Sequence, residues 1–551
     1  MDSLTIIQHN VNQWKKKAFS LSTIYRSLDP DIILINDHSL LNSTPLKIYN
    51  YITYTSNKDN SLHRGTAIAV KYTLKHHIID DFETDLLAVK IETSLGPVTI
   101  ASDYIPPSRT YFHMPDYAKL LNTPHPVYIL GDLNARHQVL GHTSTNIVGD
   151  FLKMCFDQEK LKHLGPHFPT YVNSRFATSP DIVLSNYNTY HNIHLTPGPV
   201  TASDHIPIIA KISLIPIQIP IRPRPQLSKA DWPKIKEELE NIAIPTKENP
   251  TKNDIDSYVK QWNEAMKRAM EKHTPTLNYR LIPGHAQNHE IRTLHTQLNA
   301  TYNHICTHGP SPELHHQLTI LKHQLKTKYQ ESAKETWDEI VRKMDLETDP
   351  GKFFKSIKRL QGNNKQKAPY LQDGDRKVFE PKDKETLFRE HWKNIFRNDQ
   401  EDGEFDQTNL HHVEATITDS QEQITPYRTG DLSRLNNDFP SITLAELKTL
   451  IKIQKQKAPG ENGITATHLK HLPTNMLKFL LYIFNMSLSM GYFPDSYKHA
   501  VMIFIPKGET SQHKVENYRP ISLLDVPGNL LDKIIYKRLI SLPRDEQPHK
   551  D

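Results

Sequence analysis

The sequence has only two cysteines, Cys155 and Cys306, among its 551 residues. So few cysteines exclude a disulfide framework and any zinc site built on cysteine ligands, and they fit a reducing compartment. Long apolar runs are also missing. No segment approaches the roughly 20 residues that span a bilayer, and the N-terminus has neither the basic nor the apolar region of a signal peptide. We therefore expect no membrane partner.

Glycine is scarce, with 19 residues against 38 prolines, and the hydrophobic fraction is a low 37%. These proportions predict long linkers, and the length of the chain predicts two or more domains. The formal net charge of +5 is compatible with a polyanionic partner but does not require one. Composition thus permits a nucleic-acid partner without demonstrating it.

The segment 131–137, Gly-Asp-Leu-Asn-Ala-Arg-His, follows the apolar run 126–130, which predicts a short buried strand. Because alternate residues of an extended segment point to one side, we expect Asp132 and Asn134 to face the same way. A carboxylate that can position a water, beside an amide that can hold an oxyanion, suits attack on a phosphate. The alternative is an ordinary turn rich in Asp and Asn, so the motif needs partners elsewhere in the chain.

The first 214 residues alternate short apolar runs with polar segments, a pattern typical of strands joined by loops and helices. Strands are predicted at residues 4–8, 31–35, 65–72, 86–93, 97–102, 126–130, 181–184 and 209–214, with a helix near 150–159. Polar side chains stand near the ends of these strands, namely Asn10, Asp37, Tyr104, Asp132 with Asn134, and Asp204 with His205. Loops at one end of a rigid core can converge, so we expect these side chains to share one site.

Motifs in a fixed order carry a family resemblance. They are Asn10-Val11-Asn12, Pro30-Asp31-Ile32, Tyr104-Ile105-Pro106-Pro107, Gly131-Asp132-Leu133-Asn134, Pro180-Asp181-Ile182-Val183 and Ser203-Asp204-His205. The series resembles the endonuclease/exonuclease/phosphatase family, and in particular the apurinic-type endonuclease of jockey-like non-LTR retrotransposons. The resemblance implies an α/β (α+β) fold for residues 1–214, a four-layer sandwich built on two packed, mixed β-sheets.

The resemblance also implies catalytic roles at the matching positions. Asp132 would orient or deprotonate the attacking water, and Asn134 would hold a non-bridging phosphate oxygen. His205 would bind the phosphate and stabilise its developing charge, with Asp181 orienting the imidazole. Tyr104 would contact the phosphate. Taken singly, each residue could instead serve a turn or the packing. Further residues suited to the DNA backbone are Asn12, Arg136 and His137.

A metal site is implied as well. Asp37 would be the main ligand, and Asn10 and Asp204 would lie beside the metal. This donor set consists of oxygens without cysteine, which suits Mg²⁺, or Mn²⁺, rather than zinc. The family has glutamate where this chain has Asp37, so the carboxylate is one methylene shorter. A bridging water or a shifted loop would close the gap; otherwise the nuclease is impaired at its metal.

Beyond residue 214 the composition changes. Prolines alternate through residues 215–225, which predicts an extended linker over 215–227 and a domain boundary. Residues 228–440 are predicted to be mainly helical and partly flexible, with an acidic, mobile stretch at 399–406. Two apolar stripes flank a break at 308–312 and predict an antiparallel helical hairpin; they consist of Leu294, Leu298, Ile305, Leu314, Leu318, Leu321 and Leu325.

Basic residues gather on this predicted hairpin, and we interpret them as a solvated surface, with a nucleic-acid-binding face as the alternative. They are Lys322, Lys326, Lys328, Arg342 and Lys343. Helical spacing also links Phe388, Trp392 and Phe396, which we interpret as one packing face rather than a platform for stacked bases. Whether RNA binds this region stays open.

Residues 441–551 carry a second resemblance. The segments 457–464, 503–508 and 517–524 are similar to the first motifs of non-LTR reverse transcriptases, followed by a helix through Leu530, Ile534 and Leu539. Lys507 and Arg519, expected on turns beside buried strands, would meet template or nucleotide phosphates. The catalytic aspartates of the family's palm have no counterpart in this stretch. We therefore expect that this polypeptide does not polymerise by itself.

These observations together predict a Mg²⁺-dependent DNA endonuclease joined through a helical region to part of a reverse transcriptase. The resemblance implies nicking of double-stranded DNA in the nucleus, which exposes a 3′ hydroxyl for target-primed reverse transcription, with the element's RNA as a further partner. One alternative is a phosphatase or exonuclease on the same fold. Another is a catalytically impaired nucleic-acid-binding relic. The target sequence, the choice between abasic and intact DNA, and the oligomeric state stay open.

Overall fold

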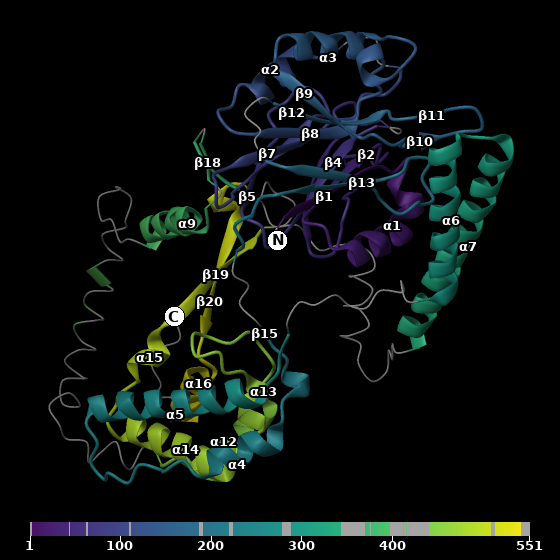
Figure 1. Cartoon of the computed structure of the whole chain (residues 1–551). Coiled ribbons are helices and arrows are strands. Elements are labelled where there is room, and N and C mark those ends of the chain that lie inside the picture. The colour runs from purple at the N-terminus through teal and green to yellow at the C-terminus, as the bar shows by residue number, and fades with distance from the viewer. Residues whose placement is uncertain are drawn as a thin grey trace. The chain divides into compact units, whose positions relative to one another are not determined.

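The structure, a computed structural model, describes most of the chain: residues 3–42, 44–61, 64–108, 112–186, 191–219, 224–277, 288–342, 370–374, 376–378, 380–396, 411, 412, 415, 418, 440–507 and 513–541. The predicted mobile stretch at 399–406 and Lys343 lie outside these residues. The chain forms two compact units, which are described separately below. One unit comprises 1–222 with 280–369, and the other comprises 223–279 with 370–551 (Figure 1).

The first unit is built on two six-stranded sheets. One has the order β13-β14-β1-β2-β4-β3, in which only β1 and β2 are parallel neighbours. The other has the order β5-β6-β7-β8-β12-β9, in which only β7 and β8 are parallel. The strands of the first sheet are β1 (Leu4–Asn10), β2 (Ile32–Asn36), β3 (Tyr51–Ser56), β4 (Thr66–Lys71), β13 (Ile193–Pro197) and β14 (Ile208–Ile212). Those of the second are β5 (His76–Ile79), β6 (Leu87–Ile91), β7 (Val98–Ser102), β8 (Val127–Asp132), β9 (Leu161–Gly165) and β12 (Asp181–Asn186).

Helices cover the outer face of each sheet, and the two inner faces pack on each other. The first sheet is covered by α1 (Trp14–Leu28), and the second by α2 (Met114–Leu121) and α3 (Ile147–Asp157) (Figure 1). The strands β2 and β8 are buried along their whole length, as their runs of Ile, Leu and Val require. The predicted four-layer α/β sandwich is confirmed. Short elements complete it: η1 (Gln138–Leu140), β10 (Tyr171–Val172) and β11 (Ala177–Thr178).

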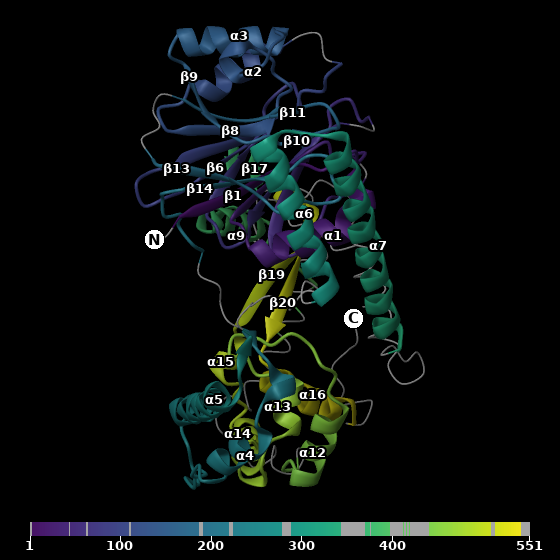
Figure 2. The same ribbon diagram turned by 45° about the vertical axis from the view of Figure 1, so that its right-hand side comes forward.

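A helical hairpin, α6 (His289–His308) and α7 (Pro312–Arg342), packs on the sandwich as part of the same unit. Figure 2 shows the two helices side by side next to α1. Leucines of both predicted stripes are buried with α1 residues in one core, among them Leu298 and Leu325 with Leu21. The amide of Val200 donates to Asn299 Oδ1 at 3.1 Å. The predicted hairpin therefore forms, and it lies with the sandwich rather than in a separate helical region at 228–440.

The second unit is mainly helical. Its core surrounds Trp262, which is fully buried and donates its Nε1–H to the carbonyl of Met476 at 3.2 Å. The helices are α4 (Trp232–Glu240), α5 (Lys252–His273), α9 (Pro381–Phe396), α12 (Leu444–Ile453), α13 (Ala466–Lys470), α14 (Thr474–Ser489), α15 (Asp495–Lys498) and α16 (Val526–Ser541). The short elements are β15 (Arg224–Pro225), β16 (Thr276–Leu277), β17 (Leu371–Asp373), β18 (Arg376–Val378), η2 (Leu227–Lys229) and η4 (Val515–Asn517). None of the helices in the described residues combines the length and apolar character needed to cross a bilayer.

The strands β19 (Ala500–Pro506) and β20 (Tyr518–Leu524) form a two-stranded antiparallel ribbon. The prediction that these strands are buried is wrong, because within the described residues they pair only with each other and most of their side chains are exposed. Phe388 of α9 stacks on Phe504 of this ribbon with ring centres 4.1 Å apart, and Trp392 lies beside it. Those two aromatic residues therefore belong to a packing face, whereas Phe396 is 66% exposed.

Truncating a leucine at the hairpin interface should destabilise the first unit. Leu298→Ala removes a fully buried side chain, so we expect the free energy of unfolding of this unit to fall by about 2–5 kcal/mol. Amide hydrogen exchange of β1 and α1 in the full chain measures the change. The control is Ile320→Ala on α7, which is 45% exposed and should change stability by less than about 0.5 kcal/mol. Equal protection in both variants would contradict hairpin docking.

Candidate active site

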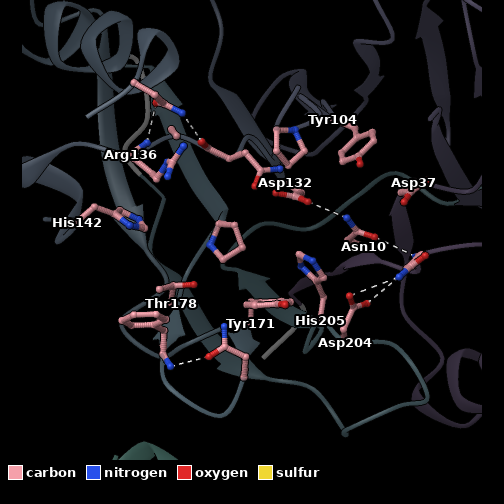
Figure 3. Close-up of a pocket in the computed structure, with 18 residues that line it drawn as sticks. Asn10, Asp37, Tyr104, Asp132, Arg136, His142, Tyr171, Thr178, Asp204 and His205 are labelled. Atoms are coloured by element: carbon pink, nitrogen blue, oxygen red, sulfur yellow. Dashed lines mark hydrogen bonds between the residues drawn. The ribbon is translucent and has the colours of Figure 1, made fainter. Parts of the chain in front are cut away.

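A pocket of about 500 Å³ opens where β1, β2 and β8 of the two sheets end. Figure 3 shows its polar side chains pointing toward one another from separate loops. Most of the residues predicted for the site line this pocket, namely Asn10, Asn12, Asp37, Tyr104, Asp132, Asn134, Arg136, Asp204 and His205. Asp181 lies directly beneath it, hydrogen-bonded to His205. The sequence-based expectation of convergence therefore matches the geometry.

Asp132 is the last residue of β8 and is almost fully buried. Its strand approaches the backbone of Asp103 so closely that a Cβ on Gly131 would lie 2.1 Å from the Asp103 carbonyl oxygen, which explains the glycine. Asn10 Nδ2 donates to Asp132 Oδ2 at 2.7 Å, while Oδ1 has no hydrogen-bond partner among the described residues. Burial, together with the charge of Asp181, raises the pKa of Asp132 to about 7.

A turn, and not the alternation of side chains along a strand, places Asn134 at the pocket. The strand ends at Asp132, and Asn134 has a left-handed backbone with φ of +46°. Asn tolerates this conformation better than most residues. Its Nδ2 donates to the carbonyl of Ile105 at 3.0 Å, and its own carbonyl accepts from Asn146 Nδ2 at 2.8 Å. Asp132 and Asn134 both line the pocket, as predicted. The predicted reason is wrong, because Asn134 lies in a turn after the strand and not on one face of it.

His205 and Asp181 form a buried pair, with Nδ1 and Oδ2 separated by 2.7 Å. Burial alone would lower the pKa of His205, but the adjacent Asp181 outweighs this effect and raises the pKa to about 9. Burial would raise the pKa of Asp181, yet His205 and donated hydrogen bonds hold it below its usual value. Thr170 Oγ1 donates to Asp181 Oδ2 at 2.6 Å, and Gln8 Nε2 donates to Asp181 Oδ1 at 2.7 Å. The pair is therefore an imidazolium and a carboxylate at neutral pH.

The pocket offers two groups that could hold a cation. Ligand atoms of Asp132, Asp181 and His205 lie within 4.8 Å of one another, so an acidic site is present. However, both carboxylate oxygens of Asp181 already accept hydrogen bonds, and its partner His205 carries a proton on Nδ1. The hydrogen bonds to Asp181 and His205 therefore occupy atoms that a cation bound by this trio would need.

The predicted ligands form the second group. The side chain of Asp37 is buried, its backbone has φ of +48°, and Ser39 Oγ donates to its Oδ1 at 2.7 Å. Asn10 Oδ1 accepts from the amide of Asn12 at 3.0 Å and keeps a second lone pair. Asp204 is exposed to the pocket. Asn10, Asp37 and Asp204 offer oxygen donors, which a hard divalent cation prefers, and they line the same pocket. Among the described acidic and histidine side chains, however, the ligand atoms that lie within 4.8 Å of one another are those of Asp132, Asp181 and His205.

Other predicted site residues have more varied positions. Tyr104 is buried at the pocket wall, and burial with the charges of Asp37 and Asp132 raises its pKa, so the phenol keeps its proton. Arg136 is exposed at the rim. His137 does not line the pocket; its Nδ1 instead accepts from the amide of Val139 and caps η1. Lys507 and Arg519 belong to the second unit, at the end of β19 and within β20.

Several residues of the site were not predicted. Gln8, Asn36 and Thr170 are fully buried beneath the pocket and join its hydrogen-bond network. Gln8 and Asn36 carried a signal, because each is a polar residue directly after the apolar run of a buried strand. The remaining rim residues are in loops and in the β10–β11 hairpin without a recognisable motif: His142, Asn146, Tyr171, Asn173, Phe176 and Thr178.

Comparisons with known proteins find related sequences and similar structures. A family model described as "Endonuclease-reverse transcriptase" matches residues 98–209. The "Probable RNA-directed DNA polymerase from transposon BS" of Drosophila melanogaster is 25% identical over 98% of this chain and 59% of its own length. The "RNA-directed DNA polymerase from mobile element jockey" of the same species is 22% identical over 93% of this chain and 56% of its own. The resemblance to jockey-like non-LTR retrotransposon proteins is confirmed.

The chain spans less than two thirds of the length of these relatives. Two solved structures similar to it are the endonuclease domain of TRAS1, a telomere-specific non-LTR retrotransposon, and the Xenopus laevis APE2 catalytic domain. The first is 18% identical with a TM-score of 0.33, covering 38% of this chain and 99% of the domain. The second is 17% identical with a TM-score of 0.33, covering 40% of this chain and 94% of the domain.

The hydrogen bond from Thr170 to Asp181 should stabilise the first unit measurably. Thr170→Val removes a buried donor to a carboxylate without a large change of shape, so we expect a loss of about 1.5–3 kcal/mol in unfolding free energy. Denaturant unfolding of the full chain measures it. Thr99→Val is the matched control, since Thr99 is equally buried but its hydroxyl has no partner among the described residues. A similar loss in both variants would contradict the assignment.

Proposed function

We propose that this chain is a metal-dependent DNA endonuclease that hydrolyses phosphodiester bonds at the pocket around Asp132 and His205. One observation supports the proposal most. Asp132, whose Oδ1 has no hydrogen-bond partner among the described residues, lies in the same polar pocket as His205, which forms a buried imidazolium–carboxylate pair with Asp181. Such a site offers a base on one side and a fixed positive charge on the other. Attack of water on a phosphodiester needs both.

Asp132 serves as the base in this proposal. A pKa near 7 leaves it partly ionised at neutral pH and basic enough to take a proton from water, which is the compromise that general bases require. Asn10 holds Oδ2, so the free Oδ1 is the atom that receives the proton. Asn10 thereby fixes the orientation of the carboxylate that acts on the water.

His205, Asn134 and Tyr104 serve as donors to the phosphate oxygens. The His205 imidazolium is fixed through Nδ1 by Asp181, which leaves Nε2–H for the substrate. Tyr104 keeps its phenolic proton, and Asn134 carries an amide at the same pocket. Donors fixed in a buried site stabilise the charge that develops on phosphate without reorganising.

The cation in this proposal is Mg²⁺, with Mn²⁺ as the alternative, held by Asp37, Asn10 and Asp204. When bound, it would polarise a phosphate oxygen. Asp37 is shorter than the glutamate of the family pattern, and the Ser39 hydroxyl and a left-handed backbone fix it. This fixed, short carboxylate is the observation that favours a second candidate, a nucleic-acid-binding protein with an impaired metal site.

We further propose that the substrate is double-stranded DNA in the nucleus and that the nick exposes a 3′ hydroxyl for reverse transcription of the element's RNA. The relatives described as RNA-directed DNA polymerases from mobile elements support this context. Asn12 and Arg136 lie at the pocket and would contact the DNA backbone. In residues 441–551, Lys507 and Arg519 would contact nucleic acid from the β19–β20 ribbon.

Removing the base or the imidazolium should abolish nicking. Asp132→Asn and His205→Ala are each expected to slow conversion of supercoiled plasmid to open circles by about 10²-fold or more, because each loses a group that acts in the transition state. The assay is gel electrophoresis with the full chain and Mg²⁺. His194→Ala, an exposed histidine on β13, is the control and should nick at the wild-type rate. Wild-type-like nicking by either site variant would refute the assignment.

Changing Asp37 separates the active enzyme from the impaired relic. Asp37→Ala should raise the Mg²⁺ concentration needed for half-maximal nicking by at least about tenfold, since a ligand is lost. Asp37→Glu should keep nicking with a similar or lower Mg²⁺ requirement. If only Asp37→Glu nicks, the wild-type chain is impaired at its metal. If no variant nicks but salt-dependent DNA binding remains, the nucleic-acid-binding candidate replaces the endonuclease.

A further inference from the structure

The α6–α7 hairpin contacts the loops that carry the proposed catalytic residues. Three hydrogen bonds join them: Tyr302 Oη donates to the carbonyl of Pro169 at 2.6 Å, Asn299 Oδ1 accepts from Val200, and Lys322 Nζ donates to the carbonyl of Ser203 at 2.6 Å. Pro169 directly precedes the Thr170 that holds Asp181, and Ser203 lies two residues before His205. The hairpin therefore contacts the backbone next to Thr170, which holds Asp181, and the backbone just before His205.

Lys322 contacts the loop that carries Asp204 and His205. Its side chain reaches from α7 to the loop instead of to solvent, and burial lowers the pKa of its ammonium to about 8, partly offset by the charge of Asp204. A desolvated ammonium costs free energy unless a hydrogen bond and a nearby carboxylate compensate. The interpretation of Lys322 as a solvated cation is therefore wrong. Lys328 is also paired, with Glu290 at 2.8 Å and Glu331 at 3.0 Å.

A second lysine has the same arrangement on the other site loop. Lys17 Nζ of α1 donates to the carbonyls of Val11 and Asn12, at 2.8 and 2.6 Å. The two loops are themselves joined, because Ser203 Oγ donates to the carbonyl of Asn10 at 2.7 Å. Each loop is thus fixed from outside by one ammonium group. The ammonium of the Ser203 loop comes from the hairpin, more than a hundred residues further along the chain.

We propose that the α6–α7 hairpin is a working part of the nuclease and that Lys322 is a positioning residue that holds the Ser203–His205 loop in its active geometry. The inference rests on the proposed function. Lys322 does not line the pocket, so it would act on the reaction through Asp204 and His205 rather than by touching DNA. Small displacements of reacting groups can reduce rates by about 10²-fold, so loss of one backbone contact is sufficient.

The test compares Lys322→Met, Lys322→Arg and Lys334→Met in the full chain with wild type. Lys322→Met keeps the length of the side chain but removes the hydrogen bond, and should lower kcat for plasmid nicking by about 10–10²-fold with little change in KM or its salt dependence. Lys322→Arg keeps a donor and should recover most of the rate. Lys334 is exposed on the same helix, so Lys334→Met should nick like wild type.

Amide hydrogen exchange supplies a readout independent of activity. In Lys322→Met, residues 201–206 should exchange faster while β1 and α1 keep their protection. Wild-type nicking by Lys322→Met would overturn the inference and leave the proposed function intact. A rise in KM with a changed salt slope would also overturn it, because Lys322 would then be a DNA contact. So would a loss of protection throughout β1 and α1 without rescue by arginine. Absence of nicking by wild type would instead refute the proposed function.

Discussion

The buried hydrogen bond between Asp181 and His205 is the interaction on which the site depends. Asp181 begins a strand of one sheet, and Gln8 of the other sheet donates to it at 2.7 Å, so the contact also joins the two halves of the sandwich. A buried carboxylate is tolerated only when its oxygens are satisfied. Thr170, Gln8 and His205 therefore stabilise the fold and fix the geometry of the pocket through the same contacts. Stability and chemistry share the same few hydrogen bonds.

Charge explains why neighbouring carboxylates can take different roles. Asp181 is held ionised by the His205 imidazolium and by hydrogen bonds from Thr170 and Gln8, whereas Asp132 accepts a side-chain hydrogen bond from the neutral Asn10 and faces the charge of Asp181. Although both are buried, Asp181 therefore stays ionised at neutral pH, whereas the pKa of Asp132 rises to about 7. Groups whose pKa values are pushed apart in this way are suited to separate acid and base roles. The difference comes from the charge of His205 and from the hydrogen bonds donated to Asp181, since both residues are buried to a similar extent.

Much of this arrangement could be predicted from the sequence, because strands of β-branched residues end in polar motifs whose order is specific. The left-handed Asn134 could not, since φ depends on the tertiary contacts that replace the strand. The exposed β19–β20 ribbon was also missed, because apolar strand residues indicate a preference for burial without showing what covers them. Likewise, the apolar stripes of the hairpin predicted which helix faces are buried, but they did not predict that these faces pack against the sandwich. Long-range packing decides these features.

The hairpin shows why a sequence motif and a working site can have different boundaries. The segment that matches the family model ends at residue 209, yet three hydrogen bonds to its loops come from residues 299–322. Functional side chains are often carried by loops, whose backbone N–H and C=O groups lack the hydrogen-bond partners that a strand or helix provides. A neighbouring helix can supply those partners, and a buried lysine supplies one with charge. The sandwich thus provides the chemical groups, and the hairpin supports the loops that carry them.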